Sequence, residues 1–245
     1  MIYFFIFLFA LAFGSFFNVC IVRLPQKQSL IPPSHCPKCN YKITKLQNIP
    51  IFSYLFLRGK CKNCGLKIAI HYFLVELITP IIFILLYLKF GLTLEFAKHI
   101  IFFSFGIIIF FIDYFHQIIP DKLSLPLILI GIIFAILAKN YTLIYGAVFG
   151  FSFFYILGYF FQYFTKKDGI GGGDIKLTTA IGAFFGLSGV VFTIVVAAVI
   201  ALVFLIAIGH AKRTYFPFGP FLIFASFLYL FFGDLITYHY WKLFL

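Results

Sequence analysis

Long apolar runs separated by short polar breaks make up most of the chain, above all from residue 72 onward. Because a helix needs about 20 mostly apolar residues to cross a bilayer, this pattern predicts about eight spans. The predicted spans cover residues 1–20, 72–89, 99–114, 123–139, 141–164, 175–188, 190–209 and 217–235. The sixth is short and carries Gly182 and Gly186, so a re-entrant or strongly tilted segment is an alternative there. The pattern indicates an all-α polytopic membrane protein.

The composition supports this interpretation and narrows the classes of partner. Hydrophobic residues make up 63% of the chain and charged residues only 11%, whereas a soluble domain carries roughly 25% charged residues. The net charge of +12 could suggest nucleic acid. However, the Lys and Arg lie in the breaks between apolar runs, as expected for contact with anionic lipid, and they form no basic face with interleaved aromatic residues. We therefore expect the lipid bilayer, and no nucleic acid, as a partner.

The distribution of positive charge predicts the orientation of the spans. Residues 1–19 are apolar and no charged side chain precedes Arg23, whereas a secretory signal begins with positive charge. We therefore expect a retained first span that starts outside and ends in the cytoplasm. Fifteen of the 19 Lys and Arg then fall on the cytoplasmic side and four outside, which is a strong positive-inside bias. This orientation places Asp113 and Asp174 at the cytoplasmic ends of their spans.

A polar insert without acidic residues follows the first span. It divides the chain into three predicted regions. These are a first transmembrane helix at 1–22, a cytoplasmic four-cysteine insert at 23–70, and a membrane domain of about seven helices at 71–245.

The insert carries two Cys-x-x-Cys motifs separated by 21 residues, formed by Cys36, Cys39, Cys61 and Cys64. The two thiolates of each tight turn can reach one ion, and two such turns complete a tetrahedron around Zn²⁺. Four protein ligands leave no position for water, so we expect a structural zinc ion. Two disulfides or four free thiols are the alternatives, and a cytoplasmic location argues against disulfides. Cys20 has no partner motif and is expected to be a packing residue.

Two of the seven acidic residues stand out, because ionisable groups at membrane depth are costly and usually functional. Asp113 closes the apolar run 100–112, and Asp174 follows a run of three glycines. A helix cap needs only one Asp or Ser, so the glycines indicate a sharp turn or a close approach of another backbone. Lys176 lies two residues further on and would point elsewhere on a helix. Our central hypothesis is that Asp113 and Asp174 meet and perform acid–base chemistry.

Most of the other titratable residues have less specific interpretations. Asp168 and Asp121 lie beside lysines and are expected to form ion pairs, while Glu95 and Asp234 fall on the outer side as ordinary interfacial residues. His116 is expected to be a solvated loop residue. No Ser/His/Asp or Cys/His combination therefore competes with the two aspartates.

At this point the motifs carry a resemblance to a known family. Gly171-x-Gly173-Asp174 resembles the GxGD signature of intramembrane aspartyl proteases, and Asp113 followed by Ile119-Pro120-Asp121 resembles the partner motif of the type IV prepilin leader peptidases. Further blocks similar to that family lie at 14–25, 48–54, 58–61, 75–77 and 217–220. One departure is Phe73, where the family pattern has Pro. The similar blocks extend over about 210 of the 245 residues.

The resemblance implies a bifunctional enzyme of the bacterial inner membrane. Such enzymes cut the short basic leader from type IV prepilins and type II secretion pseudopilins at the cytoplasmic face. They then N-methylate the new N-terminal residue, usually Phe, with S-adenosylmethionine. Members without the cysteine motifs are often peptidases only, so the motifs here favour the bifunctional form. The implied catalytic pair is Asp113 and Asp174, with Gly171, Gly173, Lys176, Pro120, Asp121 and Glu76 in supporting motifs.

Several alternatives remain at the level of sequence. No G-x-G-x-x-G follows a strand, so the sequence does not identify the S-adenosylmethionine site. Glu76 and Asp121 either bind the cationic leader or the cofactor, or pair with a nearby Lys. The alternative functions are a peptidase without methyl transfer, a proton-coupled transporter whose acids form a relay, and a membrane scaffold that docks partners through the insert. The transporter predicts acids near the bilayer midplane and inverted repeats, and no repeat is visible.

Overall fold

The structure is a computed structural model that describes the chain except residues 32, 167–168, 209–215 and 245. For residues 45–46, 208 and 234–244 it describes the backbone only. Some residues used in the sequence analysis therefore lie outside the described part, namely Lys167, Asp168, Lys212, Arg213 and the side chains of Lys45, Asp234 and Lys242. In the described part every regular element is a helix, which confirms the predicted all-α class.

The helices follow the apolar runs closely. Their bounds are α1 Ile2–Arg23, η1 Lys45–Asn48, α2 Phe52–Phe56, α3 Ile70–Phe90, α4 Leu94–His116, α5 Asp121–Leu137, α6 Tyr141–Thr165, α7 Gly172–Ile208 and α8 Gly219–Phe244. An apolar run in lipid becomes a helix because only a helix satisfies all its backbone hydrogen bonds within one segment. The two short elements η1 and α2 belong to the polar insert.

Among the described residues, five helices are long and apolar enough to cross a membrane: α1, α3, α4, α6 and α7. Helix α5 has 17 residues, and the fully described part of α8 spans Gly219–Gly233. The predicted spans 175–188 and 190–209 both lie in α7, which consists of two helical segments divided by a kink at Gly186, with φ 74° and ψ −171°. The number of predicted spans is therefore not confirmed, whereas the multi-pass membrane character is.

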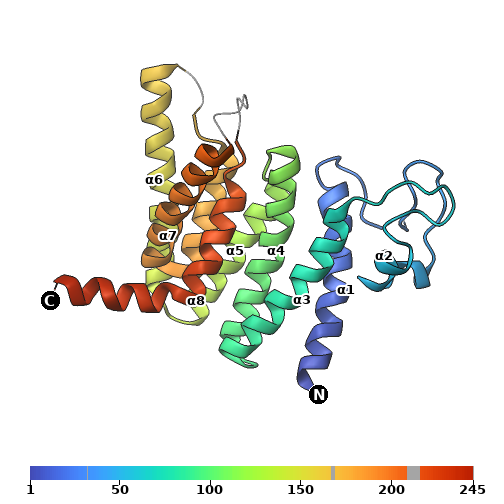
Figure 1. Cartoon of the computed structure of the whole chain (residues 1–245). Helices are drawn as coiled ribbons and strands as arrows, with labels where there is room; N and C mark the ends of the chain where they lie inside the picture. The colour runs from blue at the N-terminus through green and yellow to red at the C-terminus, as the bar shows by residue number, and fades with distance from the viewer. Residues whose placement is uncertain (32, 167–168, 209–215, 245) are drawn as a thin grey trace. The chain divides into compact units, whose positions relative to one another are not determined.

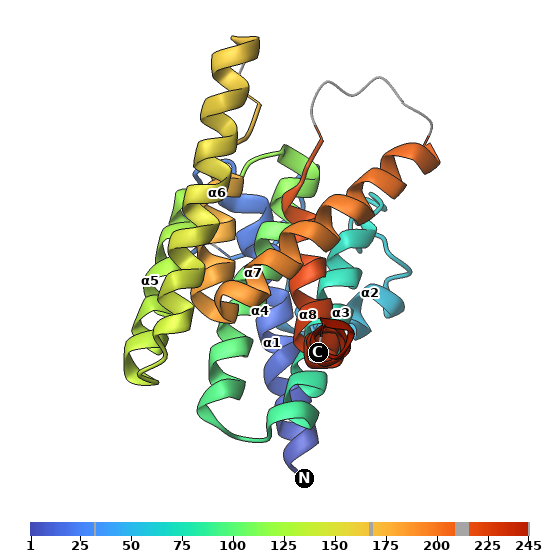
Figure 2. The same ribbon diagram turned by 90° about the vertical axis from the view of Figure 1, so that its left-hand side faces the viewer.

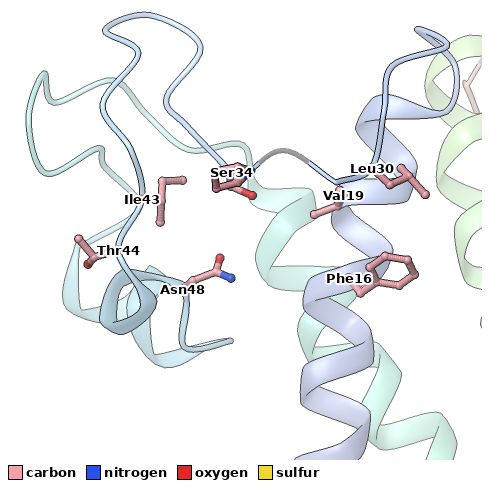
Figure 3. Close-up of a pocket in the computed structure, with 8 residues that line it drawn as sticks. Phe16, Val19, Leu30, Ser34, Ile43, Thr44 and Asn48 are labelled. Atoms are coloured by element: carbon pink, nitrogen blue, oxygen red, sulfur yellow. The ribbon is translucent and has the colours of Figure 1, made fainter.

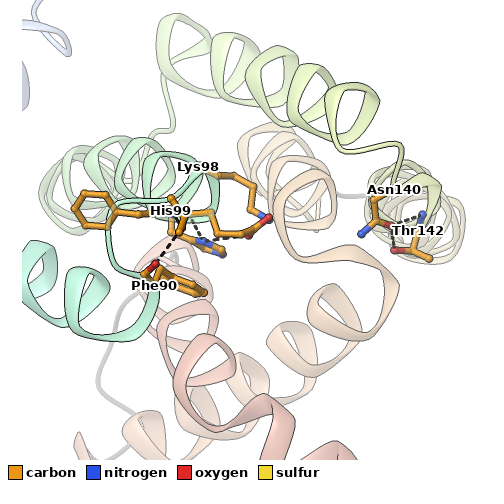
Figure 4. A network of polar contacts seen from close by, with 8 residues as sticks. Phe90, Lys98, His99, Asn140 and Thr142 are labelled. Carbon is orange, nitrogen blue, oxygen red and sulfur yellow. Dashed lines mark hydrogen bonds and ion pairs between the residues drawn. The ribbon is translucent and has the colours of Figure 1, made fainter.

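The chain forms two compact units, Met1–Ile108 and Ile109–Leu245. In the first unit, α1 packs against α3. A Cβ atom added at Gly14 would lie 3.1 Å from the Cα atom of Glu76, so the glycine allows the two backbones to approach closely. Cys20 is buried on α1, with 4% of its surface exposed, which agrees with the predicted packing role. On α4, Lys98 pairs with Glu95 at 2.5 Å (Figure 4).

In the second unit, α7 packs against α5, α6 and α8, and Figures 1 and 2 show α6 and α7 side by side. Glycines bring these two helices into backbone contact. A Cβ atom at Gly146 would lie 2.4 Å from the carbonyl carbon of Gly186, and one at Gly182 would lie 2.1 Å from the Gly146 oxygen. Helix α6 begins at Asn140, whose Oδ1 accepts the Thr142 N–H at 3.2 Å (Figure 4). Small residues at such interfaces are typical of membrane helix packing.

Candidate active site

Asp113 lies in the last turn of α4, within the second unit, and only 5% of its surface is exposed. Its Oδ2 accepts the Gly219 N–H at 2.9 Å, from the first residue of α8. A Cβ atom at Gly219 would lie 2.8 Å from this oxygen. Gly219 is therefore needed for the backbone of α8 to reach the carboxylate, and this contact fixes the orientation of Asp113.

Asp174 lies in the first turn of α7, directly after the glycine run, and is half-buried. Its backbone N–H donates to the Gly171 carbonyl at 3.0 Å. The glycines have different surroundings: a Cβ atom at Gly173 would lie 2.8 Å from the Cβ atom of Ile119, whereas one at Gly172 would meet nothing within 4 Å. The glycine at 173 is therefore explained by close packing, since its φ lies outside the positive region.

The two carboxyl groups lie close enough to interact electrostatically, although they are 61 residues apart in the sequence. Ile119 packs between Gly173 and Gly219, and so it connects the segment after α4 with the starts of α7 and α8. Neither aspartate forms an ion pair with a Lys, Arg or His in the described part of the chain. Two neighbouring acids without a cation partner cannot both ionise easily.

A separate ion pair connects the start of α5 with the start of α7. Lys176 Nζ contacts Asp121 Oδ1 at 2.5 Å, with 35% and 60% of their side chains exposed. Lys176 thus points to the first residue of α5 rather than to Asp174. Pro120 precedes α5 with φ −64°, and its carbonyl accepts the Leu123 N–H at 2.9 Å. The ion pair of Lys176 and Asp121 therefore holds the start of α5 against the start of α7.

The four cysteines of the insert gather in the first unit. Their sulfur atoms all lie within 4.8 Å of one another, with Cys36 Sγ 3.7 Å from Cys64 Sγ and Cys39 Sγ 4.0 Å from Cys61 Sγ. Ligands about 2.3 Å from a tetrahedral Zn²⁺ lie roughly 3.8 Å apart. The cluster therefore fits a zinc ion.

The two cysteine turns have the same backbone design. The Asn40 N–H donates to the Cys36 carbonyl at 2.9 Å, and the Gly65 N–H donates to the Cys61 carbonyl at 3.0 Å. Both donors have positive φ, 53° and 69°. Each turn is closed by an isolated bridge, His35 with Lys42 and Lys60 with Lys67. The two motifs are thus two copies of one local structure.

Hydrogen bonds favour the thiolate form of two of these cysteines. Hydrogen bonds from the Tyr41 backbone and the Asn63 side chain lower the pKa of Cys39 to about 6, and hydrogen bonds from the backbone of Cys64 and Asn63 lower the pKa of Cys61. A hydrogen bond from the Leu66 backbone lowers the pKa of Cys64, but burial and the neighbouring thiols outweigh it and raise the pKa to about 11. Four crowded thiolates therefore need a cation to ionise together.

Glu76, the other acid in a supporting motif, lies in the first unit on α3 and not with the aspartates. Its Oε2 accepts the Ile51 N–H at 2.6 Å, and the side chains of Asn18 and Ser15 face the same carboxylate. It forms no ion pair in the described part of the chain. Among the described side chains, Glu76 therefore has no lysine partner of the kind that the sequence left open.

A pocket of about 270 Å³ opens between α1 and the insert (Figure 3). Phe16, Val19 and Leu30 line one side, and Ser34, Thr44 and Asn48 line the other. The pocket thus combines an aromatic and aliphatic wall with three polar side chains.

Sequence reasoning missed several residues that shape these sites. Gly219, Ile119, Ile51 and Asn18 were not site candidates, although all four lie within the blocks that resemble the family. Gly219 lies between two prolines that bracket the start of a helix, which was the one local signal for it. His116 is exposed, as expected, but it is the last residue of α4 rather than part of a loop.

Comparison with known proteins agrees with the two-unit organisation. Residues 8–90 match the bacterial peptidase A24 N-terminal domain, and residues 100–206 match the type IV leader peptidase family. No solved structure matches the chain.

Curated relatives match over most of their length, and each is named prepilin leader peptidase/N-methyltransferase. The protein of Neisseria gonorrhoeae is 37% identical, over 84% of this chain and 82% of its own. That of Dichelobacter nodosus is 33% identical, over 94% and 91%. That of Pseudomonas aeruginosa is 34% identical, over 94% and 90%. The chain belongs to the type IV leader peptidase family.

Proposed function

We propose that the chain is a prepilin leader peptidase and N-methyltransferase of the bacterial inner membrane. It removes the basic leader of type IV prepilins or type II secretion pseudopilins, and it methylates the new N-terminal residue, typically Phe. The observation that supports the peptidase half is the electrostatic interaction of Asp113 with Asp174, from the ends of two membrane helices, with no cation partner among the described residues. The methyltransferase half is supported by the named activity of the relatives.

Peptide hydrolysis follows from a carboxyl pair that shares one proton. The ionised carboxylate takes a proton from a water molecule as that water attacks the scissile carbonyl. The protonated carboxyl donates a hydrogen bond to the carbonyl oxygen and stabilises its developing charge. When the tetrahedral intermediate collapses, a proton passes to the leaving amine. The pair titrates as a unit, so the acid and the base are roles of the pair rather than of one fixed residue.

The surrounding residues position this pair. The Gly219 N–H orients Asp113, and the packing of Ile119 against Gly173 sets how closely α7 approaches it. The ion pair of Lys176 and Asp121 holds the starts of α5 and α7 together. Basic leaders would be recognised at the cytoplasmic face, where the positive-inside bias of the sequence predicts both aspartates to lie.

Cys36, Cys39, Cys61 and Cys64 would hold one Zn²⁺ as a structural ion, because four thiolates leave no open position. The ion would tie together the two turns of the insert. The methyl donor would be S-adenosylmethionine, which supplies an electrophilic methyl group on a sulfonium sulfur. The pocket beside Phe16 and Asn48 is the candidate site for it.

Intact-mass spectrometry of a reaction with purified enzyme, a prepilin carrying its leader, and S-adenosylmethionine tests both halves. Wild type is expected to remove the leader and add one methyl group. Asp113→Asn and Asp174→Asn should each lower cleavage by at least about a thousandfold, because each removes a proton-transfer group. Glu95→Gln, a change of the same kind in the first unit, should cleave normally. Cleavage by either aspartate variant at the wild-type rate would refute the catalytic pair, and cleavage without methylation would leave a peptidase only.

A further inference from the structure

The Glu76 carboxylate in the first unit is not used by peptide cleavage, and its surroundings suggest a ligand of its own. It lies in the second turn of α3, close to the insert, and is only half-buried. Its contacts are with neutral groups, the Ile51 N–H at 2.6 Å and the side chains of Asn18 and Ser15. A carboxylate that has no cation in the described structure can accept one from a ligand.

The hydrogen bond from the Ile51 N–H to Glu76 requires a strained backbone conformation at Ile51. Ile51 has φ 65° and ψ −56°, and the Phe52 N–H donates to the Pro50 carbonyl at 2.7 Å across it. This is a γ-turn with positive φ, which is strained and rare for a β-branched residue. Such strain is retained where the surrounding structure requires it, and it is concentrated at functional sites. Here the turn directs one N–H at Glu76 and fixes the carboxylate in place.

Asn18 adds a second acceptor beside this carboxylate. Its Nδ2 donates to the Tyr72 carbonyl at 2.9 Å, and only 3% of the residue is exposed. Its Oδ1 is buried, and no described group donates to it. A buried acceptor without a donor is costly, so a native structure usually has a reason to keep one. Glu76 and Asn18 together offer oxygens to a ligand that carries several N–H donors.

The pocket described above adjoins this site in the sequence and on the helix. Phe16 and Val19 directly follow Ser15 and Asn18 on α1, and Asn48 precedes Ile51 by three residues. Successive residues on a helix lie about 100° apart, so the pocket occupies the neighbouring face of α1. The pocket and the Glu76 site thus use neighbouring residues of α1 and of the insert.

We propose that Glu76 and Asn18 bind the α-ammonium group that leader cleavage exposes, and that Glu76 is the base for its methylation. This inference rests on the proposed methyltransferase function. Glu76 takes one proton from the ammonium, which frees the nitrogen lone pair. The amine then forms the new C–N bond as the C–S bond of S-adenosylmethionine breaks with its electron pair left on sulfur, giving S-adenosylhomocysteine. Glu76 releases its proton to water, and the product leaves as a methylammonium group.

A binding experiment without the methyl donor tests recognition of the amine. The probe is a short synthetic peptide with a free N-terminal Phe, compared with the same peptide N-acetylated, and titrated calorimetrically into the full-length enzyme. Wild type should prefer the free amine by at least about tenfold, since a charge-assisted hydrogen bond is lost on acetylation. Glu76→Gln keeps an acceptor for the Ile51 N–H and should bind both peptides equally. An unchanged preference in this variant would overturn the proposal.

A kinetic experiment tests the role of the base with the same variants. With a precleaved pilin and S-adenosylmethionine, Glu76→Gln should methylate at least about a hundredfold more slowly. Asn18→Ala should be about tenfold slower. Leader cleavage, zinc content and calorimetric affinity for S-adenosylmethionine should remain at wild-type values, as in the matched variant Glu95→Gln.

The other outcomes have distinct meanings. If Glu76→Gln loses zinc or leader cleavage together with methylation, Glu76 only supports the Ile51 turn and the proposal is wrong. Wild-type methylation by this variant has the same consequence. If the wild-type enzyme cleaves but never methylates, the proposed methyltransferase function fails and the role of the base fails with it. In that case the peptide titration still decides separately whether Glu76 binds the amine.

Discussion

The carboxylates of the two units have opposite environments. In the second unit, Asp113 and Asp174 lie close enough to interact electrostatically, and Asp113 accepts a hydrogen bond from the Gly219 N–H. In the first unit, Glu76 is a single acid among neutral groups, with the Ile51 N–H and Asn18 around it. Two facing acids can share a proton and act as acid and base together. A single fixed carboxylate beside a spare acceptor is better suited to binding a cation.

This difference indicates that the two proposed reactions need not use the same catalytic groups. In the proposed mechanism, cleavage depends on how the end of α4 and the starts of α7 and α8 bring the aspartates together, all within the second unit. Methylation would depend on α1, α3 and the insert, all within the first unit. Changes confined to one unit should therefore affect one reaction and spare the other.

The largest selective effect is expected from the metal cluster. Cys61→Ser removes one of four ligands, and structural zinc contributes about 10–16 kcal/mol to the folding of small metal domains. Losing it should disorder the insert, including the turn that supports Glu76, so methylation of a precleaved pilin should fall to background. Leader cleavage should persist.

Zinc content by elemental analysis, together with separate assays of methylation and cleavage, checks this expectation. Cys20→Ser, a cysteine outside the cluster, is the control and should retain both metal and methylation. Equal loss of cleavage and methylation in Cys61→Ser would show that the two units do not act separately.

An intermediate effect is expected from the glycine run before Asp174, where a substitution should impair cleavage and spare methylation. Gly173→Ala would place a Cβ atom 2.8 Å from Ile119, whereas Gly172→Ala meets nothing within 4 Å. A displacement near 1 Å at a catalytic group can cost about a hundredfold in rate. We therefore expect Gly173→Ala to lower cleavage by about ten- to a hundredfold, with methylation of a precleaved pilin unchanged.

Initial rates of leader removal compare the two alanine variants, with their thermal midpoints measured in the same detergent. The Gly172→Ala variant should remain within about threefold of wild type, because a glycine-to-alanine change in open space has a small effect. If both variants lose activity equally, the close contact with Ile119 does not explain Gly173.

The smallest effect is expected from the ion pair between the starts of α5 and α7. Lys176 and Asp121 are substantially exposed, and exposed ion pairs contribute about 0–1 kcal/mol, so Lys176→Met should lower cleavage by at most about fivefold. The double exchange of Asp121→Lys with Lys176→Asp should recover part of that loss. A hundredfold loss in Lys176→Met would instead indicate direct participation in the reaction.

Much of this organisation was predictable because it depends on local sequence. The cysteine spacing predicted a four-thiol cluster, and the sulfurs do gather in one place. The apolar runs predicted the helices, since hydrophobic length alone decides whether a segment can cross a bilayer. The family could also be recognised from the sequence, because its motifs lie in short contiguous blocks.

Other features depend on residues that meet from distant segments. The chain kinks at Gly186, where α7 leaves helical geometry, and the close approach of Gly146 on α6 to this point became visible only in the structure. The role of Gly219 depends on Asp113, which lies 106 residues earlier. Ile51 gives no sequence signal for positive φ, because β-branched residues normally avoid it.

The sequence by itself thus determined the membrane class, the all-helical architecture, the cysteine cluster and the family, since periodicity, hydrophobic length and motif spacing act over short distances. The tertiary structure decided which acids share an environment. It placed Asp174 near Asp113, directed Lys176 to Asp121, and left Glu76 with Asn18 and Ile51 in the other unit. The physical reason is that the energy of a charge depends on its neighbours in space, and those neighbours are fixed by helix packing rather than by sequence order.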